Sequence, residues 1–136
     1  MFVPRGQFRV AHTHYRNVDI DSRIESANPH QLVVIMFEEV LKALDAMAVA
    51  AQRGDYTQRI QRQSRAMSIL HGLEGSLDYS KGGDIAEGLA GIYREARRLV
   101  MLGGRENDPQ HILRARAMLH EIASAWSQIG NAATPM

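Results

Sequence analysis

The 136-residue sequence contains no cysteine. This absence excludes disulfides, thiolate metal sites and a cysteine nucleophile, and it fits a reducing compartment. Aromatic residues are scarce at 6%, and 16 basic against 15 acidic residues leave a formal charge of +1. A chain with so little net charge exerts no long-range attraction on a polyanion, so we expect no nucleic-acid partner.

Long hydrophobic runs are missing as well. No stretch approaches the roughly 18 apolar residues that a membrane span needs, so we expect no membrane insertion. The amino terminus has no basic region followed by an apolar stretch, which argues against a signal peptide. We therefore place the protein in the cytoplasm. Its length and its 45% of hydrophobic residues suit a single compact domain.

The sequence does contain strong helical periodicity, beginning at Asn28 and Pro29. Asn28 is a good capping residue, and a proline in the first turn loses no intrahelical hydrogen bond. Apolar residues then recur at spacings of four and three, which predicts a helix over residues 29–53 with one buried face. Further apolar side chains project from other sides of its first turns: Leu32, Ile35, Met36 and Leu41. We therefore expect a second face of this helix to be covered.

Three more helices are predicted, over residues 56–78, 84–102 and 109–129. Gly54 and Asp55 separate the first two helices, because glycine ends a helix and aspartate caps the next. Gly82-Gly83 is expected to be a turn with Asp84 at the following helix start, and Gly103-Gly104 and Gly130 are expected to be helix ends. Asp108-Pro109 repeats the cap-plus-proline signal. We find no strand candidate. Long helices with short connections predict an all-α, antiparallel four-helix bundle.

Residues 1–27 have no single hydrophobic period and precede the bundle, which we assign to residues 28–130, with a tail at 131–136. The apolar residues near the start suggest an extended arm, whereas Tyr15, Val18 and Ile24 suggest a short helix. Both interpretations remain open. In either form, this arm is a candidate cover for the second apolar face.

A search for catalytic or metal chemistry yields little. No Glu has a His three residues later, as a di-metal bundle site would require. Asp108 and His111 have that spacing, but Asp108 is better explained as a cap. We therefore expect no enzyme activity, no cofactor and no metal. Trp126 follows the apolar stripe of the last helix and is interpreted as a core anchor. Six arginines form basic edges, interpreted as solvated faces paired with Glu: Arg59, Arg62, Arg65, Arg94, Arg97 and Arg98.

Several short motifs resemble the flagellar secretion chaperone family, FliS. The sequence Ser26-Ala27-Asn28-Pro29-His30-Gln31-Leu32 is similar to the family's Thr-Ala-Ser-Pro-x-x-Leu. A second match, from Leu77-Asp78-Tyr79 through Gly82-Gly83-Asp84-Ile85-Ala86 to Ile92-Tyr93, follows the family's order of residues. Asn107-Asp108-Pro109 and Trp126 also fit. The match spans about residues 15–129. Phe37 replaces the family's usual Tyr, and the segment after Tyr15 is longer than the family pattern.

The resemblance implies a chaperone that binds the disordered carboxy-terminal segment of flagellin, prevents its premature polymerisation and contacts the flagellar export gate. The helical pattern agrees with this function at one point, because an amphipathic segment that folds into a groove would cover the second apolar face of the helix over residues 29–53. The candidate partner-binding residues are Tyr15, Ile24, Leu32, Ile35, Met36, Ile85, Leu89, Ile92 and Tyr93. For each of them, a purely internal core position is the competing interpretation.

Two other functions stay open on the sequence alone. One is a helical adaptor that binds a different amphipathic helix, and the other is a bundle enzyme or metal protein. A homodimer also remains an open alternative.

Overall fold

The computed structural model describes residues 20–133, with side chains described up to residue 129. All regular structure in this range is helical. Residues 20–26 form a short helix, followed by α2 (Pro29–Arg53), α3 (Tyr56–Gly75), α4 (Tyr79–Glu106) and α5 (Pro109–Ala133). No helix in the described range has a stretch long and apolar enough to cross a bilayer.

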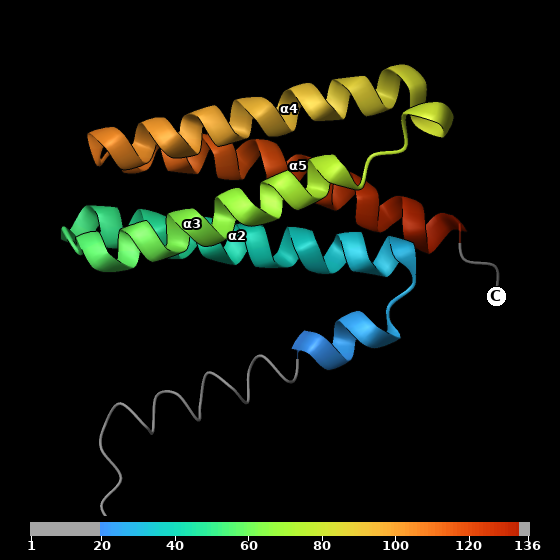
Figure 1. Cartoon of the computed structure of the whole chain (residues 1–136), viewed down its shortest axis with the longest axis horizontal. Helices are drawn as coiled ribbons and strands as arrows, with labels where there is room; N and C mark the ends of the chain where they lie inside the picture. Colours follow the sequence, from blue (N-terminus) through green and yellow to red (C-terminus); the bar gives the residue numbers. More distant parts are fainter. Residues whose placement is uncertain (1–19, 134–136) are drawn as a thin grey trace, which may run out of the picture. The chain divides into compact units, whose positions relative to one another are not determined.

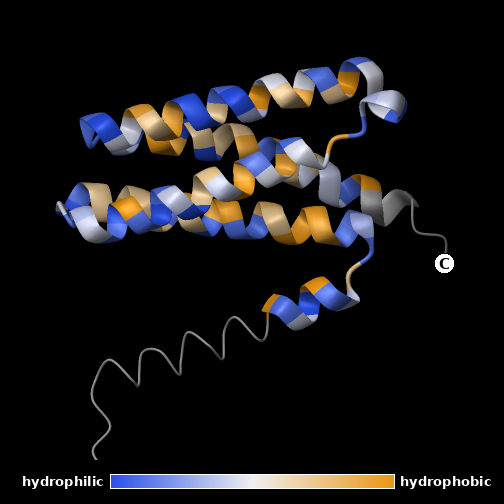
Figure 2. Ribbon diagram, in the orientation of Figure 1, coloured by the Kyte–Doolittle hydropathy of each residue, from blue (hydrophilic) through white to orange (hydrophobic). Residues whose placement is uncertain are grey.

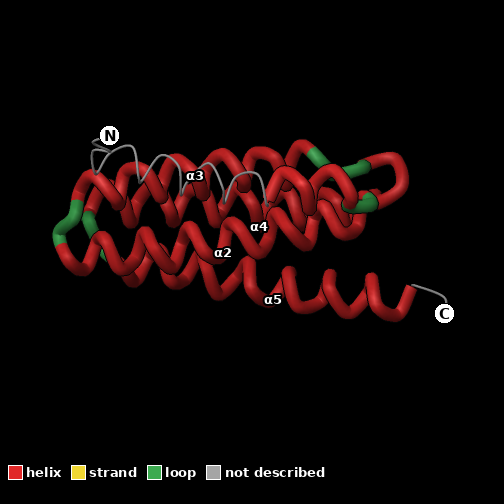
Figure 3. The backbone as a smooth tube through the Cα atoms, turned by 90° about the horizontal axis from the view of Figure 1, so that it is seen from below, coloured by secondary structure: helices red, strands yellow, loops and turns green. Residues whose placement is uncertain are grey.

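The chain separates after Leu32 into an N-terminal unit and a bundle unit. In the bundle unit, α2, α3, α4 and α5 run alternately in opposite directions, as the colour order in Figure 1 shows. Figure 3 shows α5 beside α2, which closes the ring of four helices. The all-α, antiparallel four-helix bundle predicted from the sequence is confirmed.

Local capping explains where most of the helices begin. The Gln31 backbone N–H donates to Asn28 Oδ1 at 2.7 Å, and the Asn28 N–H donates to Gln31 Oε1 at 3.0 Å, which is a reciprocal capping box. Asp55 accepts from the Gln58 N–H at 3.2 Å, and Asp108 accepts from the Gln110 N–H at 2.9 Å. All three caps were expected from the sequence.

The start of α4 agrees with the prediction in part. Non-helical Gly83, at φ 50° and ψ −124°, interrupts the helix, so the expected break is present and a helical segment continues from Asp84. A positive φ of this kind favours glycine. The sequence did not predict the additional turn that begins at Tyr79 with Asp78 as its cap: Asp78 Oδ1 accepts from the backbone N–H groups of Ser80 at 3.1 Å and Lys81 at 3.2 Å. α3 also ends earlier than expected, at Gly75, with Ser76 as its C-cap.

Gly103 and Gly104 do not end α4, as the sequence suggested; both are buried within it. A Cβ on Gly103 would lie 2.7 Å from Ile112 Cγ1, and one on Gly104 would collide with the Gln63 side chain. These glycines therefore let α5 and α3 approach α4 closely. The helix ends at Glu106, and its C-cap is Asn107, whose backbone is left-handed at φ 52°. Similarly, α5 continues through Gly130 to Ala133.

The core is formed by one cluster of buried side chains from all four helices of the bundle unit. Figure 2 shows apolar residues concentrated in the first turns of α2 and along the inner faces of the other helices. The largest fully buried members are Val40, Leu44, Met47, Leu70, Leu73, Leu99, Val100, Ile112 and Leu119. Most of these lie in the second half of α2 and α4 and in the first half of α5, so this half of the bundle contains most of the fully buried core.

Candidate functional site

An apolar groove opens at the other end of the bundle unit. Its volume is about 320 Å³, far more than the 10–15 Å³ that one water molecule needs. It is lined by Val33 and Phe37 of α2, by Ile85, Ala86, Leu89 and Tyr93 of α4, by Ile122 and Trp126 of α5, and by Ser76, Leu77, Asp78, Lys81 and Gly82 around the α3–α4 connection. We call this set the groove.

The groove exists because α3 stops short. α3 ends at Gly75, so Leu77 and the following connection, instead of a further helical turn, border the space between α2, α4 and α5. The C-cap at Ser76 fixes this end: its N–H donates to Gly72 O at 3.0 Å, and its hydroxyl donates to Leu73 O at 2.8 Å. An apolar surface that a fourth helix would have covered therefore stays open.

Two residues of α4 show the range of environments in the groove. Ile85 is 75% exposed, which is unusual for so apolar a side chain. Tyr93 is only 3% exposed and contacts Phe37, with the ring centroids 6.4 Å apart and the planes inclined by 47°. Burial raises the pKa of the Tyr93 hydroxyl to about 12, so it is neutral at physiological pH. The groove thus has an exposed apolar lip and a deep aromatic wall.

The polar residues lie around the α3–α4 connection. The Asp78 carboxylate accepts from the Ser80 hydroxyl at 2.6 Å as well as from the two backbone N–H groups of the cap. These hydrogen bonds, with the Ser80 hydroxyl the largest contribution, lower the pKa of Asp78. Lys81 places a cation at the same part of the rim.

The structure brings together only some of the residues predicted to bind a partner. Ile85, Leu89 and Tyr93 line the groove. Ile35 is buried in the core, Met36 packs against the core with its Cε beside Gly72, and Ile92 is half-buried without lining the groove.

The remaining predicted residues belong to the N-terminal unit. Ile24 and Leu32 are both exposed there. Tyr15 lies outside the described residues.

Sequence reasoning missed five large apolar side chains of the groove: Val33, Phe37, Leu77, Ile122 and Trp126. Most of them follow the inward stripes of their helices and were therefore interpreted as core. They are core residues as well, since Phe37 is buried and Trp126 packs against the buried cluster. The signal that would have identified them is an apolar helix face that extends beyond the end of the neighbouring helix, here α3.

The basic edge of α4 is paired with Glu, as expected, whereas on α3 Arg65 contacts Glu39 at 3.5 Å and Arg59 donates to the neutral Gln63. Arg97 and Arg94 both bind Glu74, at 2.5 and 3.1 Å, which ties α4 to α3. The Arg97 hydrogen bond, followed by that of Arg94, lowers the pKa of Glu74. Arg98 pairs with Glu95 on its own helix.

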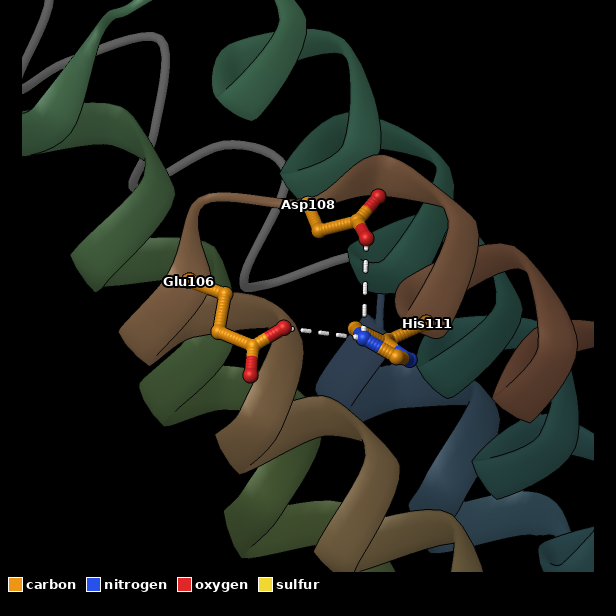
Figure 4. A group of neighbouring side chains, drawn as sticks. All are labelled: Glu106, Asp108 and His111. Carbon is orange, nitrogen blue, oxygen red and sulfur yellow. Dashed lines mark hydrogen bonds and ion pairs between the residues drawn. The ribbon is translucent and has the colours of Figure 1, made fainter.

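One cluster of potential metal ligands lies at the α4–α5 corner, formed by Glu106, Asp108 and His111 (Figure 4). His111 Nε2 is 3.1 Å from Glu106 Oε2 and 3.5 Å from Asp108 Oδ2, while Asp108 Oδ1 caps α5. A metal-bound histidine normally donates its second ring N–H to an acceptor, but His111 Nδ1 is buried without a partner. The geometry therefore fits a helix cap with an adjoining hydrogen bond between His111 and Glu106 better than a metal site.

Comparison with known proteins identifies the family of the chain. The family model for flagellar protein FliS matches residues 11–133. The chain belongs to the FliS family. Its FliS relatives include the flagellar secretion chaperone FliS of Salmonella typhimurium, 34% identical over 116 residues, which cover 85% of this chain and 86% of the relative. The Vibrio cholerae protein of the same name is 30% identical over 115 residues, covering 85% of each chain. A FliS-family relative from Pseudomonas aeruginosa, flagellar secretion chaperone FliSB, is 26% identical over 117 residues, covering 86% of this chain and 93% of its own.

Proposed function

We propose that this protein is a flagellar secretion chaperone that binds the disordered carboxy-terminal segment of flagellin in the groove. By holding that segment, it keeps flagellin from polymerising in the cytoplasm and assists its delivery to the export apparatus. The observation that carries the proposal is a large apolar groove, with Ile85 exposed at its lip, in a bundle of the FliS family.

The chemistry of the groove favours a helical occupant. Its walls come from three helices, and their apolar side chains suit the apolar face of an amphipathic segment. A segment that folds as it binds buries about 1,000–3,000 Å² and gives up roughly 2–5 kcal/mol in ordering. The groove alone is too small for such an area, so we expect it to anchor one part of a longer contact.

We further propose that the N-terminal arm, from Tyr15 to Ile24, covers apolar surface of the bundle in the free protein and moves when flagellin binds. Ile24 is an apolar residue of the short helix at residues 20–26 and offers a side chain for such a contact. Deletion of residues 1–24 should raise the binding of a hydrophobic dye and change the affinity for flagellin. If neither changes, the arm is not a cover. A contact with the export gate is proposed from family membership alone, without assigned residues.

The test of the main proposal is calorimetric titration with the last 50 or so residues of flagellin from the same organism, at two temperatures. We expect saturable binding with a negative heat-capacity change, the mark of buried apolar surface. Circular dichroism should first establish that the bundle is folded. An absence of binding by the folded protein would overturn the proposal and favour an adaptor for another amphipathic helix.

A further inference from the structure

Tyr93 carries a hydroxyl that the chain itself does not use. Tyr93 is only 3% exposed, and it lines the groove. Among the residues that the structure describes, no group forms a hydrogen bond with this hydroxyl, and the aromatic neighbour of the Tyr93 ring is Phe37. Burial alone accounts for its raised pKa.

The hydroxyl is not sealed inside the core. The enclosed side-chain atoms without a partner in the described part of the chain are Arg59 Nε, Asn107 Oδ1 and His111 Nδ1, and the Tyr93 oxygen is not one of them. Its access is therefore to the groove that Tyr93 lines. A tyrosine in so apolar a setting normally finds a hydrogen-bond partner for its hydroxyl. A group that enters the groove is the partner available to it.

We propose that the Tyr93 hydroxyl is a recognition element, which donates a hydrogen bond to a neutral polar side chain on the apolar face of the bound flagellin segment. This inference rests on the proposed function and adds the chemistry of the occupant. It makes the groove selective for a segment that carries an acceptor among its apolar anchors, instead of any apolar helix.

The class of the acceptor follows from the surroundings. Phe37, Leu89 and Trp126 line the same groove, so a carboxylate buried among them beside Tyr93 would lose its hydration. The cation that lines the groove, Lys81, lies twelve residues before Tyr93 in α4, at the α3–α4 connection. The backbone carbonyls of a bound helix already accept their own helical hydrogen bonds. The remaining acceptors are the side-chain oxygens of Asn, Gln, Ser and Thr. We therefore expect one such residue on the apolar face of the flagellin segment.

The test compares two substitutions that each remove one tyrosine hydroxyl. Tyr93→Phe keeps the ring and its contact with Phe37, whereas Tyr56→Phe changes a residue that is 60% exposed and does not line the groove. Affinity is measured by fluorescence anisotropy with a labelled peptide of the last 50 or so flagellin residues. Because an acceptor left unpaired in an apolar site is costly, Tyr93→Phe should weaken binding about tenfold, and Tyr56→Phe should leave it unchanged.

The partner residue is identified by a double-mutant cycle. Each Asn, Gln, Ser and Thr of the peptide is replaced by Ala and titrated against both proteins. One replacement should weaken binding to the unchanged protein but have little further effect on the Tyr93→Phe variant, as expected for a shared interaction.

The remaining outcomes separate this inference from the proposed function. If the unchanged protein binds and Tyr93→Phe binds within twofold of it, the hydroxyl inference is overturned while the proposed function stands. If the unchanged protein does not bind, both are overturned. If Tyr93→Phe lowers the melting temperature or fails to fold, the hydroxyl serves this chain and not a partner, and the inference is overturned.

Discussion

Replacing Ile85 with serine should weaken the binding of flagellin without weakening the fold. Ile85 is 75% exposed at the lip of the groove, so its side chain contributes little to the packing of the free protein. Ser and Ile have similar helix propensities, so α4 itself should be unaffected.

The magnitude of the loss follows from the exposed area. Full burial of an isoleucine side chain is worth about 1.5–3 kcal/mol, and about three quarters of that, roughly 1–2 kcal/mol, remains available to a partner. The expected loss of affinity is therefore about five- to thirtyfold.

The assay is the same titration with the flagellin peptide, accompanied by thermal unfolding of both proteins. Met101→Ser is the matched control, because Met101 lies on the same helix, is 57% exposed and does not line the groove. Unchanged affinity of the Ile85→Ser variant would refute the groove as the binding site. An equal loss in both variants would show that binding does not centre on the groove.

Three further predictions concern stability. Gly103→Ala should destabilise the bundle by about 1–3 kcal/mol in chemical denaturation, because its Cβ would overlap Ile112. The control Gly88→Ala, at an open helical position, should stabilise the bundle by about 0.5–1 kcal/mol. Equal effects of the two substitutions would contradict the close packing of Gly103 against Ile112. Glu74→Gln should lower the free energy of unfolding by about 1 kcal/mol at neutral pH, because it removes the ion pairs of Glu74 with α4. Since the folded pKa of Glu74 is lowered, this difference in stability from the unchanged protein should disappear as the pH falls below about 4.5. A difference in stability that persists at acidic pH would refute this. The pKa of Tyr93 is raised to about 12 in the folded state, against about 10 when unfolded, so this group stabilises the folded state below pH 10. As the pH rises from 10 to 12, the free energy of unfolding should fall by roughly 2–3 kcal/mol more in the unchanged protein than in Tyr93→Phe. Urea denaturation at both pH values would detect this difference.

The helix starts that the sequence predicted correctly depend on local chemistry. Asn28, Asp55 and Asp108 each cap a helix through a backbone N–H two or three residues later, so a short stretch of sequence contains the whole interaction. At α4 the sequence predicted the break at Gly83 and the segment from Asp84, but it missed the additional turn from Tyr79, because Asp78 and Asp84 can both act as caps.

The errors at Gly103 and Gly104 have a different cause. Paired glycines are a reasonable local signal for a helix end, but here they fit beneath Ile112 and Gln63 from other helices. That requirement comes from the packing of helices far apart in sequence. Local pattern and tertiary packing disagreed at this position, and packing determined the structure.

The candidate site was partly predictable for a similar reason. The helical period placed Ile85 and Leu89 on one face of α4, and the resemblance to the FliS family added Tyr93; all three line the groove. The same period could not reveal that Phe37 and Trp126 reach a space left open by α3. Periodicity gives the direction in which a side chain points, whereas the presence of a groove depends on where a neighbouring helix ends.

The two ends of the bundle unit differ in role: one end stabilises the fold, and the groove end is the proposed binding site. Far from the groove, Gly103 packs under Ile112, and the Asn107 side-chain amide donates to Ala51 O at 3.1 Å, so the connections there are firmly tied to the core. Leu44, Met47 and Leu99 are fully buried in that half, where they can stabilise the fold whether or not the groove is occupied. A chaperone must exist both with and without its client, and a buried core in that half allows the groove end to keep exposed apolar surface without unfolding. We therefore interpret the early end of α3 as the feature that leaves one end of the bundle open for the proposed client segment.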